Sequence, residues 1–330
     1  MRQRQLRTIA AAAALAFLLV LIPHGGTAQP DSTGYPNRTI KLIVGFAAGG
    51  GNDIFARIVG QALQETVGQT VIVENKPGAG GRVAAEYVAA QPADGYTLLV
   101  GASGAMAIGP AVIEKINYDT LRDFTPISLM AEFPLLMVVN SDHPARTVND
   151  LVAWAKANPD KANYGTSSTA FTLATELFKL KSGAPFVAIP YKSGNEMATS
   201  VMAGQSAMTI VDPPPVTPQI QSGRLRGLAV TAPVRLADLP DVPTMDEAGF
   251  SDVHVALWSG IFAPAKLPPA VAKRLESEVR RIMQQPEVRD KFRALATNAV
   301  GSSSEEFVRR IESETKMWRD VANAAHLKFD

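Results

Sequence analysis

The chain has 330 residues, of which 46% are hydrophobic and 19% charged, and its formal net charge is +1. This near-neutral balance gives no electrostatic basis for binding nucleic acid or an acidic membrane surface. The sequence contains no cysteine. Disulfides, cysteine-ligated metal sites and a lipid anchor on a cysteine are therefore excluded.

The first 28 residues are predicted to be a secretory signal peptide that is cleaved before Gln29. Three arginines lie within the first seven residues, the apolar stretch 9–22 is short for a membrane span, and residues 26–28 are small. A retained membrane anchor is the alternative. Cleavage leaves 29 basic and 31 acidic residues, a net charge of about −2. About 300 residues can bury more than one core, so we expect two domains.

The stretch 40–67 has the pattern of a strand, a glycine turn and a helix. Apolar residues at 40–46 fit a strand buried on both faces, and Gly49, Gly50 and Gly51 follow directly. Apolar residues then recur at helical spacing to about Val67. The start of a helix offers unpaired N–H groups and a positive dipole end, and glycine lets a ligand approach the backbone. We expect an anion at this turn, although a tight turn alone would also use glycine.

Strand and helix patterns alternate along most of the remaining chain. Strands are expected at 70–74, 96–100, 124–129, 135–140, 162–165, 186–191, 207–211, 225–231 and 253–262. Helices are expected at 82–90, 147–157, 173–180, 196–203 and 217–222, and over most of the chain after 268. The alternation predicts a parallel-rich α/β fold with ligands beyond the carboxyl ends of strands. The hydroxyl-rich turn 166–169 predicts a second ligand loop that faces the first across a cleft.

Two classes of enzyme, an α/β hydrolase and a nucleotide-binding oxidoreductase, are alternatives to a binding protein. The stretch 101–105 (GASGA) is close to the turn that carries a nucleophilic serine in α/β hydrolases, which would make Ser103 the nucleophile, but its last glycine is missing. An exported α/β hydrolase remains the alternative function. A nucleotide-binding oxidoreductase would need G-x-G-x-x-G, which the glycines at 45–51 do not form. The mature histidines show no metal-ligand spacing.

Several stretches, in this order along nearly the whole mature chain, resemble the Bug family (also called TctC), the extracytoplasmic solute receptors of tripartite tricarboxylate transporters. They are YPNRTIKLIVGFAAGGGNDIFAR (35–57), VIVENKPGAGG (71–81), DGYTLLVG (94–101), NYDTLRDFTPIS (117–128), IPYKSG (189–194), GRLRGLAVT (223–231), LPDVPTMDEAGF (239–250) and FAPAKLPP (262–269). The resemblance implies a type II periplasmic-binding-protein fold: two α/β lobes joined by crossing hinge strands, with the ligand cleft between them. Lobe 1 would be 35–132 plus 255–330, and lobe 2 would be 133–254.

The resemblance also implies the function. A protein of this family has no catalytic activity and no cofactor. It closes on a small carboxylate in the periplasm, here a dicarboxylate, tricarboxylate, amino acid or aromatic acid, and delivers it to the membrane permease. We expect a monomer, and signalling to a sensor kinase is a compatible further role.

The family pattern also suggests the residues of the site. In the first lobe it points to the loop from Phe46 to Asp53, with the amides of Ala48, Gly49 and Gly50 on a carboxylate. Asp53 would orient this loop, accept from the ligand, or act only as a charge at the helix start. Arg82 would bind a distal carboxylate or be a solvated helix residue. The full set of expected ligand residues is Phe46, Ala47, Ala48, Gly49, Gly50, Asn52, Asp53, Arg82, Ser103, Gly104, Thr166, Ser167, Ser168, Thr169, Phe171, Tyr191, Ser193 and Asp212.

In the second lobe the sequence departs from the family pattern at two places. The turn 166–169 is shorter and poorer in glycine than in relatives, and Phe171 follows it, either as an apolar wall of the site or as a core residue. Asp212 is followed by three prolines, 213–215, which stiffen this segment and remove amide donors.

Overall fold

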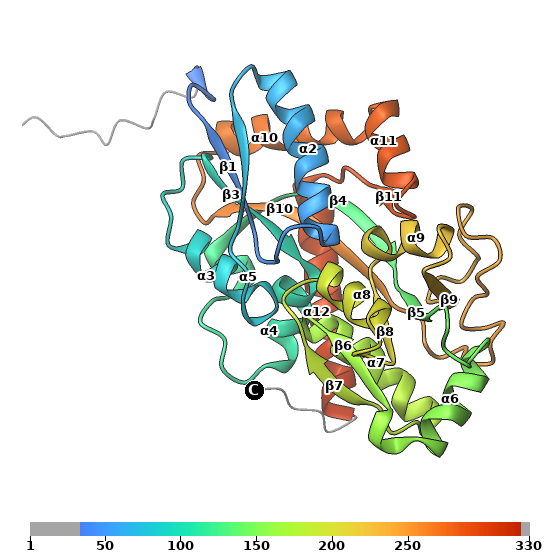
Figure 1. The fold of residues 1–330 in the computed structure, drawn as a ribbon. Coiled ribbons are helices and arrows are strands. Elements are labelled where there is room, and N and C mark those ends of the chain that lie inside the picture. Colours follow the sequence, from blue (N-terminus) through green and yellow to red (C-terminus); the bar gives the residue numbers. More distant parts are fainter. Residues whose placement is uncertain (1–33, 325–330) are drawn as a thin grey trace, which may run out of the picture. The chain divides into compact units, whose positions relative to one another are not determined.

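The computed structural model describes residues 34–324, without the side chains of residues 321 and 324, and places their strands in two sheets (Figure 1). The predicted signal peptide lies outside these residues. The six-stranded sheet has the order β11 (Asn298–Ala299), β4 (Phe124–Pro134), β10 (Ala256–Pro264), β3 (Thr97–Ala102), β1 (Ile40–Val44) and β2 (Val71–Asn75). The five-stranded sheet has the order β7 (Val187–Pro190), β6 (Asn163–Thr166), β8 (Met208–Val211), β5 (Leu136–Asn140) and β9 (Leu225–Val230). We call these sheets, with the helices packed on them, the first and the second lobe.

Both sheets are mixed, so the expectation of a parallel-rich fold was wrong in this respect. β1 is parallel to β2 and β3, and β6 is parallel to β7 and β8. β10 is antiparallel to β3 and β4, and β5 is antiparallel to β8 and β9. The antiparallel strands lie where the chain crosses between lobes: β4 leads into β5 through Leu135, and β10 brings the chain back. The parallel pairs, whose strands are joined through helices, therefore all lie within a single lobe.

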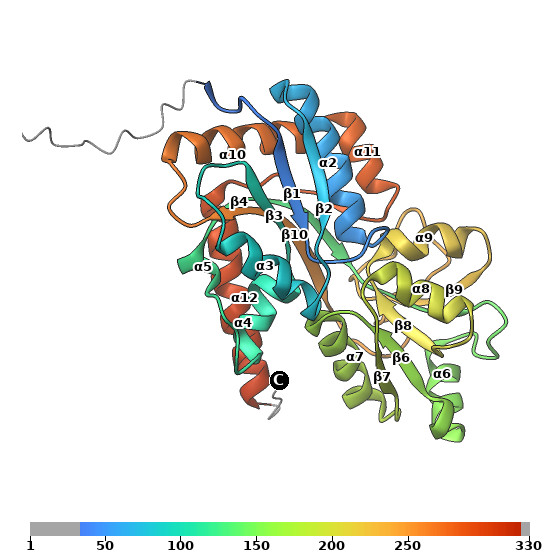
Figure 2. The same ribbon diagram turned by 60° about the vertical axis from the view of Figure 1, so that its left-hand side comes forward.

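The helices cover both sheets in the arrangement of an α/β fold (Figures 1 and 2). They are α2 (Gly51–Val67), η2 (Ala79–Gly81), α3 (Arg82–Ala89), η3 (Gly104–Ile108), α4 (Gly109–Val112), α5 (Thr120–Asp123), α6 (Val148–Ala157), η4 (Pro159–Lys161), α7 (Thr169–Ser182), α8 (Gly194–Met202), α9 (Pro213–Gln221), α10 (Pro269–Met283), α11 (Pro286–Arg293) and α12 (Ser304–Ala324). The short elements η2, η3, α4, α5 and η4 were not expected. α9 begins at Pro213 rather than at 217, because proline is tolerated in the first turn of a helix. The C-terminal part contains the short strand β11.

The carboxyl-terminal helices return to the first lobe. α10 and α11 lie beside α2 in both views, although more than 200 residues separate them in the sequence (Figures 1 and 2). Phe55 of α2 stacks on Phe292 of α11 with 5.2 Å between ring centroids, and both side chains are fully buried. The core of the first lobe is therefore built from both ends of the described chain.

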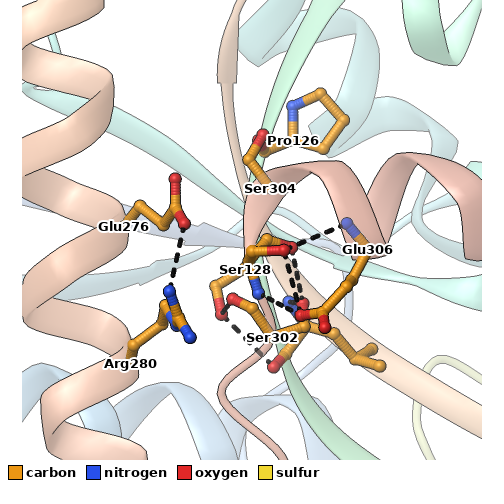
Figure 3. Close-up of polar contacts among 9 residues, drawn as sticks. Pro126, Ser128, Glu276, Arg280, Ser302, Ser304 and Glu306 are labelled. Atoms are coloured by element: carbon orange, nitrogen blue, oxygen red, sulfur yellow. Dashed lines mark hydrogen bonds and ion pairs between the residues drawn. The ribbon is translucent and has the colours of Figure 1, made fainter.

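The start of α12 is fixed to β4 by a cluster of serines (Figure 3). Ser303 N–H donates to Glu306 Oε2 at 2.8 Å, and Glu306 N–H donates to Ser303 Oγ at 3.2 Å. This reciprocal pair is a capping box, which satisfies two N–H groups at the helix start. Ser128 Oγ of β4 donates to the carbonyl of Ser302 at 2.8 Å. The cap holds α12 in register along the crossing strand.

Within residues 34–324, no helix has the length and apolar character needed to cross a membrane.

Candidate ligand-binding site

A cavity of about 230 Å³ lies between loops of the two lobes. Its walls follow the carboxyl ends of the parallel strand pairs β1–β2 and β6–β7, the edge at which α/β sheets bind ligands. The lining residues are Gly45, Phe46, Pro77, Gly78, Ala79 and Gly80 from the first lobe and Ser167, Tyr191 and Lys192 from the second. Of these residues Lys192 alone carries a charge.

Four helices begin within a few residues of this lining. α2 and α3 start in the first lobe at Gly51 and Arg82, and α7 and α8 start in the second lobe at Thr169 and Gly194. Each helix start carries a partial positive charge and N–H groups without intrahelical partners. Ser167 Oγ is buried and has no hydrogen-bond partner among the described residues. The site is therefore suited to an acceptor-rich, negatively charged guest.

Some N–H groups of the glycine loop in the first lobe already donate to acceptors within the protein. Gly49 N–H donates to Asp53 Oδ2 at 3.0 Å, and Ala47 N–H donates across to the carbonyl of Lys192 at 3.4 Å. Asp53 Oδ1 also accepts from Arg57 and from Asn75, each at 2.9 Å. Burial favours the neutral acid, but the hydrogen bonds from Arg57, Gly49 and Asn75 outweigh it and lower the pKa of Asp53. Asp53 therefore orients the loop with an ionised carboxylate.

We expect Asp53→Ala to lower the free energy of unfolding by about 2 kcal/mol, because it removes a buried charged acceptor from three donors. Since folding lowers the pKa of Asp53 below 3.8, its contribution is present above that pH and is lost as the pH falls through the folded value. Urea unfolding at neutral pH and near pH 3 measures both effects. Glu65→Ala, an exposed acid on the same helix, is the control. If the difference in unfolding free energy between the two variants did not become smaller near pH 3, this role of Asp53 would be contradicted.

Glycines bring the backbones of the two lobes into contact around the cavity. A side-chain carbon on Gly80 would lie 3.2 Å from the Cα of Ser168, and one on Gly104 would lie 3.2 Å from the Cβ of Ala170. A carbon on Gly51 would overlap Oδ2 of Asp212. At these points beside the cavity the lobes touch, so the structure is a closed arrangement of the two lobes.

The structure places the expected ligand residues in three groups. Phe46, Ser167 and Tyr191 line the cavity. A second group contacts the opposite lobe beside the cavity: Ala47, Gly49, Gly50, Gly104, Ser168, Thr169, Ser193 and Asp212. The remaining residues, which neither line the cavity nor make these contacts, are Ala48, Asn52, Asp53, Arg82, Ser103, Thr166 and Phe171.

Members of the third group bond or pack within their own surroundings. Arg82 Nε donates to the carbonyl of Ala79 at 3.0 Å, so the guanidinium folds back onto its own loop. Asn52 Oδ1 accepts from Ser259 Oγ in β10 at 2.5 Å. Phe171 is 6% exposed and belongs to the hydrophobic core. Of the two roles considered for Phe171, the structure therefore shows the core role.

The sequence reasoning missed the second glycine loop, 77–80, as part of the site. Residues 78–81 all have positive φ, including Ala79 at 47° and Gly80 at 64°. Glycine adopts such angles without strain, whereas alanine does so at a cost. The signal was present, because this run follows a strand and precedes a helix just as 49–51 does. Gly45 and Lys192 were also missed, and neither carries a pattern that separates it from its neighbours.

The arrangement of Ser103 does not support a hydrolase. Its side chain is 1% exposed and its Oγ accepts from the N–H of Trp258 at 3.4 Å. The described histidines are engaged elsewhere: His143 Nδ1 accepts from Ala145 N–H, and His254 pairs with Asp246. No group of three possible metal ligands occurs among His, Cys, Asp and Glu of residues 34–324.

Comparison with known proteins decides the family. Residues 55–327 match the family model described as "Tripartite tricarboxylate transporter family receptor". The chain belongs to this receptor family. It is also 33% identical to the protein BugT of Bordetella pertussis over 319 residues, which cover 96% of this chain and 98% of BugT.

Several solved structures share this fold. R. palustris Rpa4515, solved with adipate, superposes with a TM-score of 0.85 at 33% identity, covering 89% of this chain and 99% of the other. MatC of Rhodopseudomonas palustris, solved with bound malate, gives a TM-score of 0.83 at 27% identity, with coverage of 87% and 99%. The periplasmic binding protein BugD also superposes, with a TM-score of 0.85 at 28% identity and coverage of 89% and 99%, which confirms the expected periplasmic-binding-protein architecture.

Proposed function

We propose that this chain is an exported receptor that closes its two lobes on a small carboxylate and delivers it to the membrane permease of a tripartite tricarboxylate transporter. The lobes would be residues 35–132 plus 255–330 and residues 133–254, since the first sheet takes its strands from 40–134 and 256–299 and the second from 136–230. β4–β5 and the segment before β10 would form the hinge. The role is binding and not catalysis.

The observation that carries the proposal is the chemistry of the cavity. Ser167 and Lys192 are among its lining residues, the buried hydroxyl of Ser167 has no partner among the described residues, and four helices begin beside the cavity. Such a site can replace the water around a carboxylate with hydrogen-bond donors and needs no buried cationic side chain to pair with it. Lobe closure would complete the site by joining the two sets of donors.

The size of the cavity limits the guest. A volume of about 230 Å³ corresponds to roughly eight water molecules of liquid. Adipate and malate, the ligands of the two solved relatives, are carboxylates of this scale. A thermal-shift screen of small carboxylates against neutral compounds of equal size tests the proposal, because a ligand at 100 times its Kd stabilises by about 2.7 kcal/mol. A set of hits without a single acid would refute it.

We expect Ser167→Ala to weaken binding of the best carboxylate from that screen about tenfold, or about 1.4 kcal/mol. The reason is that Ser167 lines the cavity and its buried Oγ has no partner among the described residues, so a rotation of this side chain would let it donate to the guest. Calorimetric titration measures the affinity. Ser277→Ala, at an exposed position of α10, should bind like the wild type. Equal affinity of the Ser167 variant would remove this hydroxyl from the site.

A further inference from the structure

Asp212 is a buried carboxyl group held between the two lobes. It lies at the start of α9 in the second lobe, and its side chain reaches α2 of the first lobe, where Oδ2 fills the space that a side chain on Gly51 would occupy. Oδ1 lies 2.6 Å from the position of a Cβ on Gly194, so a glycine borders each oxygen. The residue is 3% exposed. No ion pair to it occurs among residues 34–324, although an ionised carboxylate at such a depth normally needs a partner.

The three prolines after Asp212 withhold the donors that usually stabilise an acid at this place. An aspartate at the N-cap of a helix normally accepts from the N–H groups of the second or third helical residue. In α9 these residues are Pro214 and Pro215, which have no N–H, and Asp212 makes no capping hydrogen bond. The start of α9 therefore offers little compensation for a negative charge, which leaves only the starts of α2 and α8 beside the carboxyl, at Gly51 and Gly194.

The charged groups around Asp212 do not replace that compensation. On α2, Asp53 is turned towards Arg57 and Asn75. On α8, Glu196 accepts from the N–H of Lys192. α9 and β8 carry no titratable side chain. Burial raises the pKa of Asp212 to about 7, and the N–H groups of Asp212 itself and of Gly51 oppose this only in part.

We propose that Asp212 is a proton-binding site that couples lobe closure to pH: the closed arrangement takes up a proton at this carboxyl, and opening releases it. The coupling follows from position, because Gly51 and Asp212 belong to different lobes and separate when the cleft opens. Water then reaches the carboxyl and favours its ionised form. The inference rests on the proposed function in that it assumes lobe closure.

The sign of the coupling follows from linkage. Since closure raises the pKa of Asp212, the closed form gains relative to the open form as the pH falls through the closed-state value. Above that value both forms are ionised and the dependence vanishes. Between about pH 8 and about pH 6 the closed-to-open ratio should rise about tenfold. Acid would thus favour capture and alkali release.

Distances between spin labels on the two lobes test this directly. The chain has no cysteine, so Glu65→Cys on α2 and Gln205→Cys after α8, both at exposed positions, provide one label in each lobe. Distance distributions are recorded at both pH values, with and without adipate as the probe. We expect the ligand-free wild type to shift towards the short distance at the lower pH. Asp212→Asn should be closed to the same extent at both pH values. Asp160→Asn, which changes an exposed acid of the second lobe, should respond to pH like the wild type.

A second variant tests the part played by the prolines and does not rely on Asp212→Asn folding. Pro215→Ala restores an N–H group at the third position of α9, which can donate to the ionised carboxylate. The pH at which the lobes shift should fall by about one unit. A wild type with the same distances at both pH values would overturn the proton site even if adipate closes the lobes. A pH response that Asp212→Asn removes, with no effect of adipate, would support the proton site and count against adipate as the ligand.

Discussion

Replacing Gly51 by alanine is expected to weaken carboxylate binding by about 100-fold or more while the ligand-free protein stays as stable as the wild type. The added methyl group would overlap the carboxyl of Asp212 in the closed arrangement, and this carboxyl is held by Gly194 on its other side. In an open arrangement nothing opposes the methyl group, and alanine is the better helix former by up to about 1 kcal/mol. A 100-fold loss corresponds to about 2.7 kcal/mol, within the cost of an overpacked contact.

The neighbouring glycine provides the matched control for this variant. A Cβ on Gly50 would lie 3.4 Å from the Cβ of Ser193, an ordinary contact, and the backbone there has an ordinary φ of −80°. Gly50→Ala should therefore bind within about threefold of the wild type. The double variant Gly51→Ala/Asp212→Ala should recover most of the affinity, since the overlap is gone. Calorimetry with the best carboxylate and melting without ligand measure both properties. Tight binding by Gly51→Ala alone would show that the ligand-bound form lacks this contact.

Local chemistry made much of this fold predictable. The turn 49–51 precedes a helix because glycine accepts the positive φ of 84° at position 49 and the close approach at position 51. Thr147 and Asp150 form a capping box at the start of α6, where a helix was expected. The structure shows helices after both expected ligand turns. Features that depend on a few adjacent residues were thus readable from the sequence.

Features that depend on pairing between distant segments could not be predicted from the sequence. Nothing near β4 or β10 in the sequence shows that they pair antiparallel over nine residues of β10. The role of each donor in the first loop also depends on distant groups, since Gly49 bonds to Asp53, which Asn75 of β2 helps to position. Arg82 could have reached the cavity by sequence, but the carbonyl of Ala79 accepts its Nε. Patterns predict which loops meet a ligand more reliably than they predict which atoms do.

The crossing strands are tied to the C-terminal helix by a polar network around the buried carboxyl of Glu314. Trp258 Nε1 of β10 donates to Glu314 Oε2 at 2.6 Å, and Arg310 Nε donates to Glu314 Oε1 at 2.6 Å. Arg310 Nη2 also donates to Glu132 Oε1 of β4 at 2.9 Å. Trp258 is fully buried and Glu314 is 8% exposed. Burial raises the pKa of Glu314, while Arg310 and Trp258 act in the opposite direction. One helix thus holds both strands that pass between the lobes.

We expect Glu314→Ala to lower the free energy of unfolding by about 3 kcal/mol, because it leaves the buried N–H of Trp258 without an acceptor and removes a partner of Arg310. The melting temperature should fall by at least about 5 °C. Glu314→Gln should lose less, since the amide oxygen still accepts from one donor. Glu312→Ala, an exposed acid on the same helix, should stay within about 0.5 kcal/mol of the wild type. Equal stability of the Glu312 and Glu314 alanine variants would show that α12 is held by its apolar face and its serine cap, and that this network contributes nothing to the anchoring of β4 and β10.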